Sequence, residues 1–383
     1  MLAMLAYCTA EAKSFLVHSD QEFNSATLAV HPGDEIVVAN GTYTPWAVTL
    51  IANGIANNPI TIKAQTAGQV IFTGTVNQPV FKIQSNYIVL QGMSFSNCTL
   101  NKINGLSGQL IELDNTQHTR ITGCTFEKNR GMAQFMPLVI VSGSGLYNQI
   151  DHCTFTSNID EIDVQVKVTQ QSYPTYTLIN NNTFTDKAKV SWANNNGGEC
   201  IQVGQDPVLL GTLASKTTVR KNHFMRCSAE PEVISNKSSE NLYIANNFED
   251  CGSELVMRGG HDCLVDSNVF KGGIGAIRVN GSGHIITHNV ISNVPTGIRL
   301  MYGMTQGRTE VGFYVAATNC TISANKINHT GTGILVGDAK NEDWTGKFDT
   351  KRYPSRTLRD VPPASNTIAH NKFSQNLHNI ISN

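Results

Sequence analysis

Two carboxylates and two cations in the middle of the chain have the types and spacing of a chemical site. Glu230 and Glu232 are separated by a single residue, so in an extended strand their side chains point to the same face and can share one cation. Lys237 follows in the same stretch, and Arg258 comes further along the chain. If the backbone coils with a period near the interval from Lys237 to Arg258, the two cations lie one above the other on one face.

A run of oxygen-bearing side chains precedes these residues. The segment 194–199 reads Asn-Asn-Asn-Gly-Gly-Glu and would arrive from the preceding coil. Amide and carboxylate oxygens are ligands that suit Ca²⁺. The alternative is that Glu230 and Glu232 are solvated residues on a strand edge. Lys237 and Arg258 beside them favour a site, because an acidic sugar would require cations next to a carboxylate-bound metal.

Such a group of side chains has the chemistry for β-elimination on a uronic-acid polymer. The proton on the carbon next to a uronate carboxylate is weakly acidic, and its removal requires stabilisation of the negative charge that develops. A bound Ca²⁺ can take the uronate carboxylate as a ligand and act as a Lewis acid. A lysine among other cations can take the proton, and an Arg or a Tyr can assist the leaving glycosidic oxygen.

A short repeated pattern supplies the coils that this geometry needs. It consists of an apolar residue, two spacers, a small or polar residue that is most often Asn, one spacer, and then Phe or Ile. Short strands of this kind cannot bury their apolar side alone, so they stack. The shortest interval between units equals that from Lys237 to Arg258, and longer intervals indicate coils with inserted loops. The fourth position of the ten units is Met93, Cys124, Cys153, Asn182, Asn222, Asn246, Asn268, Asn289, Asn325 and Asn371.

These repeats predict an all-β protein, a right-handed single-stranded parallel β-helix, or solenoid, with the Asn side chains in hydrogen-bonded ladders inside the coil. Residues 19–22 form a possible capping box, and apolar residues follow at helical spacing, which predicts a short N-terminal capping helix. Residues 36–43 and 60–64 have the composition of strands. We expect residues 13–383 to form a single domain with an inserted loop at about 340–363.

Composition and charge narrow the classes of function. The chain has 28 Lys and Arg against 29 Asp and Glu, so its overall field gives no reason to expect nucleic acid, and no stretch has the length of a membrane span. The spacing of the nine cysteines matches no zinc site.

The apolar residues 1–12 end in Ala-x-Ala and suggest the remnant of a signal peptide, which predicts a secreted or periplasmic protein. Residues 5–8 only half resemble a lipoprotein cleavage box.

Three segments together resemble polysaccharide lyase family 6, which contains alginate lyases and chondroitinase B. They are 196–201 (Asn-Gly-Gly-Glu-Cys-Ile), 230–241 (Glu-x-Glu-x-Ile-x-x-Lys-Ser-x-x-Asn), and the Arg that follows this Lys after the interval of one bare coil. The resemblance implies that Ca²⁺ is bound by Asn196, Glu230 and Glu232. It also implies that Lys237 is the base and Arg258 the acid. Glu199 is a further candidate ligand of the metal.

The chain departs from the family next to Arg258. Family members commonly have His directly after this Arg, whereas here two glycines intervene before His261, which either replaces that His from a shifted position or only flanks the cleft. Arg278 and Arg299 are separated by the same interval on similar strands and would extend the face of Arg258 as a basic ladder for substrate carboxylates. Solvated arginines on a sheet face are the alternative. Tyr302 and His284 are further candidates for contact with the sugar.

The hypothesis that these observations favour is a Ca²⁺-dependent lyase acting on an acidic polysaccharide, with alginate preferred, and we expect a monomer. A dermatan or chondroitin sulfate lyase with the same site is the nearest alternative. A glycosidase could use Glu230 and Glu232, but it would leave Lys237 and Arg258 unexplained. A glycan-binding β-helix without catalytic activity is the remaining alternative.

Overall fold

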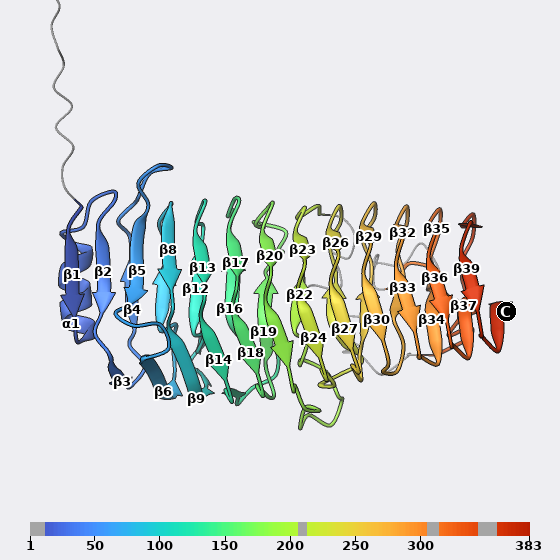
Figure 1. The fold of residues 1–383 in the computed structure, drawn as a ribbon, viewed down its shortest axis with the longest axis horizontal. Helices are drawn as coiled ribbons and strands as arrows, with labels where there is room; N and C mark the ends of the chain where they lie inside the picture. Colours follow the sequence, from blue (N-terminus) through green and yellow to red (C-terminus); the bar gives the residue numbers. More distant parts are fainter. Residues whose placement is uncertain (1–11, 206–212, 305–313, 344–357) are drawn as a thin grey trace, which may run out of the picture.

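The structure, a computed structural model, describes residues 12–205, 213–304, 314–343 and 358–383. The chain winds into stacked coils, each of which contributes short parallel strands to three long sheets (Figure 1). The predicted parallel β-helix is therefore confirmed. The proposed signal remnant at 1–12 lies almost entirely outside the described residues, as does most of the inserted loop at 340–363. Among the described residues, no helix is long and apolar enough to cross a membrane.

Sheet A has thirteen strands and forms the first side of each coil. Its strands are β1 (Ser14–Val17), β2 (Glu35–Val38), β5 (Ile60–Ala64), β8 (Ile88–Gln91), β13 (Arg120–Thr122), β17 (Gln149–Asp151), β20 (Leu178–Asn180), β23 (Thr218–Arg220), β26 (Leu242–Ile244), β29 (Leu264–Asp266), β32 (Ile285–Thr287), β35 (Thr321–Ser323) and β38 (Thr367–Ala369).

Sheet B forms the second side, and the short strand β15 (Arg130–Gly131) pairs with its third strand. Its strands are β3 (Gly41–Tyr43), β6 (Val70–Val76), β9 (Ser94–Leu100), β14 (Thr125–Glu127), β18 (Thr154–Thr156), β21 (Thr183–Thr185), β24 (His223–Met225), β27 (Asn247–Glu249), β30 (Val269–Lys271), β33 (Val290–Ser292), β36 (Lys326–Asn328) and β39 (Lys372–Ser374).

Sheet C has twelve strands and forms the third side, and a separate hairpin joins β10 (Lys102–Ile103) to β11 (Leu106–Ser107). Its strands are β4 (Val48–Leu50), β7 (Phe81–Ile83), β12 (Ile111–Asp114), β16 (Pro137–Ser142), β19 (Ile162–Val166), β22 (Ile201–Val203), β25 (Glu232–Asn236), β28 (Glu254–Met257), β31 (Ile277–Val279), β34 (Thr296–Met301), β37 (Thr332–Asp338) and β40 (His378–Ser382).

The helix α1 (Asp20–Thr27) covers the N-terminal end of the stack, as predicted (Figure 1). Ser19 is its N-cap and accepts a hydrogen bond from the backbone N–H of Glu22. The buried ring of Phe23 packs 5.7 Å from Phe81 and 5.9 Å from Trp46, between ring centroids. The helix thus shields the apolar interior of the first coils from water.

The repeated pattern forms two interior columns. Its last position gives a stack of parallel phenylalanine rings whose centroids are 4.5 to 5.2 Å apart from Phe95 to Phe270. Its fourth position gives the amide ladder. Asn246 is typical: its amide group donates to Val219 and Asn268, and its Oδ1 accepts from both the backbone and the side chain of Asn222. Every rung is therefore tied to the next through buried, satisfied polar groups.

The residue before each ladder asparagine has a left-handed backbone. This conformation is strained for residues other than glycine, and the closed ladder that follows offsets the strain. The residues are Asn181, Lys221, Ala245, Ser267, His288, Ala324 and His370, with φ between 53° and 57°.

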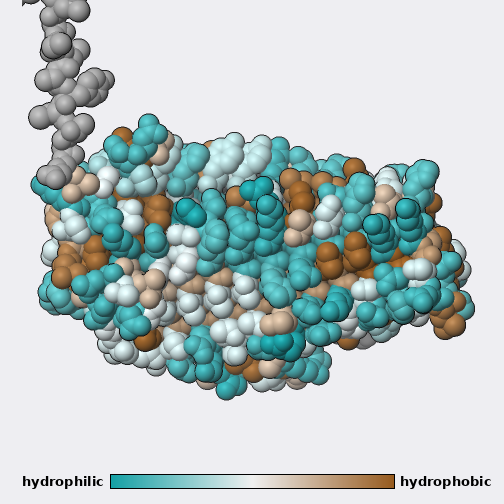
Figure 2. Space-filling model, viewed as in Figure 1, coloured by the Kyte–Doolittle hydropathy of each residue, from teal (hydrophilic) through white to brown (hydrophobic). Residues whose placement is uncertain are grey.

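The cysteines also lie in the interior of the coil. All eight that the structure describes are buried and free, and Cys124 and Cys153 occupy ladder positions, where the backbone N–H of Cys153 donates to the amide of Asn182. Their role in the described part of the chain is to fill the interior of the coil. The outer surface is largely hydrophilic on the face shown in Figure 2, with apolar patches toward both ends of the stack.

The ladder makes a testable prediction. Replacing Asn246 by Ala removes four side-chain hydrogen bonds and leaves the buried backbone N–H of Asn222 without its acceptor, so the free energy of unfolding should fall by about 2–4 kcal/mol. Urea denaturation, followed by circular dichroism, measures this free energy of unfolding. The exposed neighbour Asn247 is the matched control, and Asn247→Ala should change little. Equal stability of the two variants would contradict the ladder as a source of stability.

Candidate active site

Sheet C brings the charged residues together where its strands end. Strand β25 pairs with β28 so that Asn236 lies opposite Met257, and the next residues along the two strands are Lys237 and Arg258. Neighbouring parallel strands are about 4.8 Å apart, so the two cations start from adjacent backbone positions in consecutive coils. The interval from Lys237 to Arg258 is therefore one coil, as the sequence predicted.

The side chain of Asn236 fixes the ends of both strands. It is fully buried, and its Oδ1 accepts from the amide of Asn241 at 2.7 Å and from the hydroxyl of Tyr243 at 2.8 Å. Its Nδ2 donates to the carbonyl oxygens of Ser238 at 2.9 Å and Gly259 at 3.0 Å. One buried amide therefore holds the backbone just beyond Lys237 and just beyond Arg258, which makes their relative position rigid.

Arg278 and Arg299 lie on the same outer face, two residues back along the strand from the register of Arg258. Arg278 pairs with Arg299 in the next coil and with Val256 in the previous one, so the two arginines stack on each other and not on Arg258. The basic ladder predicted along this face is present, but Arg258 stands beside it and not in it. Despite this offset, the guanidinium groups of Arg258 and Arg278 both reach the same carboxylate oxygen, that of Glu232.

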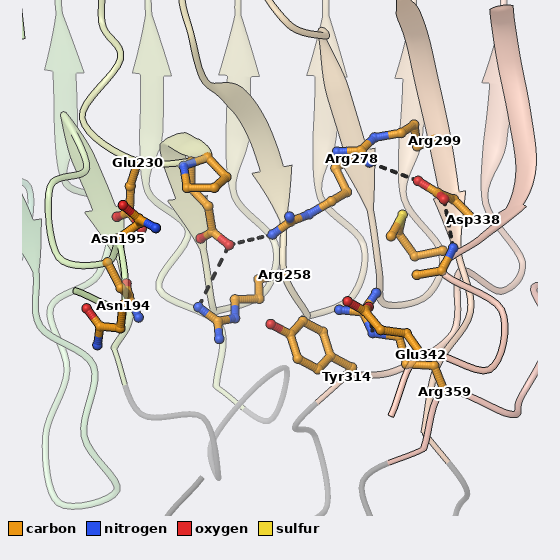
Figure 3. A pocket seen from close by; sticks show the side chains of 15 residues that line it. Asn194, Asn195, Glu230, Arg258, Arg278, Arg299, Tyr314, Asp338, Glu342 and Arg359 are labelled. Carbon is orange, nitrogen blue, oxygen red and sulfur yellow. Dashed lines mark hydrogen bonds and ion pairs between the residues drawn. The ribbon is translucent and has the colours of Figure 1, made fainter. Parts of the chain in front are cut away.

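These side chains line a pocket of about 480 Å³ on the outer face of sheet C (Figure 3). One wall holds the oxygen donors of the segment 194–196 with Glu230 and Glu232, and the opposite wall holds arginines. The full lining is Asn194, Asn195, Asn196, Glu230, Pro231, Glu232, Arg258, Arg278, Arg299, Met301, Tyr314, Asp338, Ala339, Glu342 and Arg359.

Glu232 is the centre of the charge network. One of its oxygens lies 2.5 Å from Arg278 and 3.8 Å from Arg258. Burial by itself would raise the pKa of Glu232, but the fields of Arg258, Arg278 and Lys237 outweigh it and lower the pKa to about 2. Glu232 is therefore ionised, and its other oxygen is buried with no hydrogen-bond partner among the described residues.

Glu230 shows the opposite behaviour. Burial and the nearby carboxylate of Glu199 raise its pKa well above the usual value, and the field of Glu232 adds to the rise. Its Oε1 accepts a hydrogen bond from the backbone N–H of Gly198 at 3.2 Å, which ties it to the loop that carries Asn196. The carboxylates of Glu199 and Glu230 thus face each other without enough positive charge between them.

This arrangement fits a hard cation. Glu199 and Glu232 each have a buried oxygen without a hydrogen-bond partner in the described part of the chain, and Asn196 lines the pocket on the same wall. The described residues contain no preformed group of three or more His, Cys, Asp or Glu side chains in metal-binding geometry. The donors that are present, carboxylate and amide oxygens, are those that Ca²⁺ takes together with water. A divalent cation would relieve the repulsion that raises the pKa of Glu230.

Lys237 is buried behind this wall and is not among the residues that line the pocket. Its Nζ lies 3.6 Å from an oxygen of Glu199, which also accepts a hydrogen bond of 2.7 Å from Gln202. Gln202 in turn accepts from Gln165 at 2.6 Å. The position of the Lys237 ammonium is therefore set through Glu199 by a row of side chains from two preceding coils.

Three further residues named from the sequence lie outside the pocket lining. His261 is about two-fifths exposed and contacts Asp262 at 2.7 Å. Tyr302 is buried, and the ammonium of Lys340 lies 6.0 Å from its ring. His284 requires a correction: it lies inside the coil, fully buried, where no sugar can reach it.

Both ring nitrogens of His284 contact the backbone. Its Nδ1 accepts from the backbone N–H of Cys263 at 3.1 Å, and its Nε2 lies 3.2 Å from the carbonyl of Asn280. Burial lowers its pKa to about 4, so the ring is neutral at physiological pH. His284 thus forms buried hydrogen bonds with the backbone inside the coil, as the ladder asparagines do at their own positions.

The structure also adds residues that the sequence did not single out. Tyr314, Asp338, Glu342 and Arg359 line the pocket; Asp338 ends strand β37, and the other three come from segments that depart from the repeat. Glu342 and Arg359 belong to the inserted loop expected at about 340–363. Tyr314 gives no signal in the sequence, because a single aromatic residue in an insertion matches no pattern.

The loop with the oxygen donors is held from the side by Gln134. The Nε2 of Gln134 donates to the Oδ1 of Asn194 and to the backbone carbonyl of Asn196, both at 2.8 Å. Gly197 has a φ of +90°, and a Cβ at this position would come within 3.0 Å of the Gln134 side chain. The loop therefore fits against Gln134 only with glycine at 197.

Comparison with known proteins places this geometry in a family. The family described as chondroitinase B matches residues 17–380 of the chain. Curated protein sequences give no match.

Solved structures share the fold. A mannuronic acid specific family 6 polysaccharide lyase from human gut microbiota has a TM-score of 0.79 at 23% identity, over 96% of this chain and 82% of that one. The alginate lyase AlyGC has a TM-score of 0.78 at 23% identity, over 97% and 53%. A family 6 polysaccharide lyase from Pseudopedobacter saltans has a TM-score of 0.79 at 21% identity, over 96% and 92%.

The contact of Gln134 with the loop predicts a local effect on dynamics. In Gln134→Ala the two donated hydrogen bonds disappear, so amide hydrogen exchange in the segment 194–198 should accelerate by about tenfold or more. Exchange followed by mass spectrometry measures it in the protein without added ligands. Gln149→Ala, on sheet A, should leave this segment unchanged. Unaltered exchange in Gln134→Ala would show that the loop is held by other contacts.

Proposed function

Because the chain belongs to the chondroitinase B family, that is, to polysaccharide lyase family 6, we propose that it cleaves alginate by Ca²⁺-assisted β-elimination. One observation carries the proposal. Lys237 and Arg258 occupy adjacent positions in consecutive coils: Arg258 lines the pocket, and Lys237 lies directly behind its wall of carboxylates, 3.6 Å from Glu199. A base, a cation near the leaving group and sites for carboxylates are the parts that elimination from a polyuronate needs.

In the proposed mechanism the arginines bind the polymer and Lys237 moves the proton. Arg278 and Arg299 hold uronate carboxylates, and Lys237 removes the proton from the carbon next to the reacting carboxylate. Arg258 meets the leaving glycosidic oxygen. Burial disfavours its charge, but the fields of Tyr314 and Glu232 outweigh burial and raise its pKa, so it acts as a charged hydrogen-bond donor. The leaving oxygen finally takes a proton from water, and the hydroxide that remains takes the proton from Lys237, which restores the base and leaves no net consumption of water.

The calcium part of the proposal rests on the carboxylate wall. Asn196, Glu230 and Glu232 would hold the ion, with Glu199 as an additional ligand. When bound, Ca²⁺ supplies Lewis-acid stabilisation of the uronate carboxylate as the neighbouring carbon loses its proton. The buried oxygens of Glu199 and Glu232, which have no partner among the described residues, and the raised pKa of Glu230 support the assignment. Secretion or periplasmic export, and a monomeric state, remain predictions from the sequence.

Alginate is proposed over dermatan or chondroitin sulfate because similar structures are described as alginate lyases, including one in complex with a trisaccharide. Because the matching family is described as chondroitinase B, dermatan sulfate and chondroitin sulfate are the nearest alternative substrates. A panel of alginate, mannuronate and guluronate blocks, dermatan sulfate and chondroitin sulfate distinguishes them.

One observation favours a second candidate, a glycosidase. The pKa of Glu230 is raised and that of Glu232 is lowered to about 2, which is the pattern of an acid and an ionised carboxylate in a hydrolytic pair. Hydrolysis would release reducing ends without an unsaturated sugar. A purely binding β-helix would release neither.

The first functional prediction concerns the base. Purified protein with alginate should raise absorbance near ~235 nm, and Lys237→Ala should lower the rate by about 10²–10⁴-fold, because proton transfer is lost. Lys271→Ala, a change at a largely exposed lysine on sheet B, is the control and should retain the wild-type rate. Equal rates for Lys237→Ala and wild type, with both folded by circular dichroism, would remove Lys237 from the mechanism.

The second prediction concerns the metal. Treatment with a chelator followed by dialysis should abolish the absorbance change, and Ca²⁺ should restore it. In Glu230→Gln the Ca²⁺ concentration for half-maximal rate should rise about tenfold or more, since one charged ligand is lost. Glu249→Gln, a change on sheet B, serves as the control. Full activity after chelation would refute the requirement for Ca²⁺ while leaving the assignment of Lys237 open to its own test.

A further inference from the structure

Tyr314 makes a contact with Arg258 that none of the assigned roles explains. Its ring lies in the pocket wall between two guanidinium groups, with the Cζ of Arg258 at 5.2 Å from the ring centroid and the Cζ of Arg359 at 4.1 Å (Figure 3). Cations over an aromatic face are attracted by the negative charge of the ring face. The two arginines therefore share one ring, which separates groups that would otherwise repel each other.

The ion pair of Arg258 with Glu232 does little to fix its direction. The pair is long, 3.8 Å, because the same carboxylate oxygen binds Arg278 more closely at 2.5 Å. The Nε of Arg258 is buried and has no hydrogen-bond partner among the described residues. A guanidinium with one loose ion pair can rotate about several side-chain bonds, so the ring of Tyr314 is the contact that restricts it.

The backbone at Tyr314 is well anchored. Its carbonyl oxygen accepts from the backbone N–H of Met304 at 2.9 Å. The carbonyl of the next residue, Val315, accepts from the side chain of Asn280 at 2.9 Å and from the backbone of Gly281 at 3.1 Å. These bonds connect the start of the segment 314–343 to the body of the coil.

Gly303 allows this segment to come close. A Cβ at Gly303 would lie 2.1 Å from the backbone nitrogen of Ala316, so only glycine permits the approach. Gly303 also exchanges two backbone hydrogen bonds with Val361, at 2.8 and 3.0 Å, which brings in the segment that carries Arg359. Two chain segments outside the repeat thus meet at one glycine and place Tyr314 over Arg258.

We propose that Tyr314 is a positioning residue: its ring orients the Arg258 guanidinium toward the leaving glycosidic oxygen, and Arg359 holds the ring from the other side. This inference rests on the proposed function. It assigns the effect to the aromatic face of Tyr314 and not to its hydroxyl, so phenylalanine should replace tyrosine and an aliphatic residue should not.

The test compares Tyr314→Phe with Tyr314→Leu in the absorbance assay for the unsaturated product. Tyr314→Phe should keep kcat within about threefold of wild type, whereas Tyr314→Leu should lower kcat by about 10- to 30-fold with a smaller change in KM, since the misdirected Arg258 acts on the leaving group. Tyr147→Leu, on the outside of the coil far along the chain, is the control and should have wild-type rates. A wild-type kcat in Tyr314→Leu, or an equal loss in Tyr314→Phe, overturns the proposal, and the latter result would assign the role to the hydroxyl.

A second readout does not depend on the substrate. Phenylglyoxal modifies arginine side chains, and peptide mass spectrometry gives the rate at each arginine. In Tyr314→Leu the rate at Arg258 should rise several-fold relative to the exposed Arg226, and in Tyr314→Phe it should stay at the wild-type value. An unchanged rate in Tyr314→Leu overturns the positioning role. A raised rate in a protein that cleaves none of the polymers supports the contact and refutes the proposed function, so the two failures are distinct.

Discussion

The register between successive coils is the constraint on which the rest of the structure depends. Each ladder amide binds the coil before it and the coil after it, so a slip of one residue would break a row of buried hydrogen bonds. Asn236 applies the same principle at the site, since one side chain binds the backbone next to Lys237 and next to Arg258. The site is therefore held by the interior of the coil, although the arginines that would meet a substrate line the outer pocket.

Single charged side chains in the pocket form ion pairs with two partners of opposite charge. Glu232 serves two arginines, and Arg299 lies between Glu254 and Asp338, so each guanidinium keeps some capacity for a further anion. The carboxylates of Glu199 and Glu230 meet on the other wall with too little positive charge. A polyanion and a divalent cation, bound together, would satisfy both walls. This complementarity would allow the chain to bind the proposed acidic polymer without an overall positive charge.

The sequence predicted the parts that repeat and missed the parts that do not. The ladder asparagines and the Phe column recur at fixed offsets, so the coil, the capping helix and the pairing of Lys237 with Arg258 could be predicted from spacing alone. His284 was misjudged because it lies outside the repeated pattern, whose polar position in this coil is Asn289, and nothing in the pattern showed that the His284 ring fills the interior. Tyr314, Gln134 and Arg359 reach the site from insertions, and contacts across 60 residues or more, such as Gln134 with Asn194, have no periodic signal.

The central claim is that consecutive coils arrange one ammonium, one guanidinium and a carboxylate-bound Ca²⁺ around a single uronate ring. A crystal structure of the inactive Lys237→Ala variant with Ca²⁺ and an alginate oligosaccharide tests it most directly. We expect Ca²⁺ on Asn196, Glu230 and Glu232, the reacting uronate carboxylate on that ion, and the glycosidic oxygen within hydrogen-bond distance of Arg258. An oligosaccharide bound to another face of the coil, or Ca²⁺ held by other residues, would contradict it.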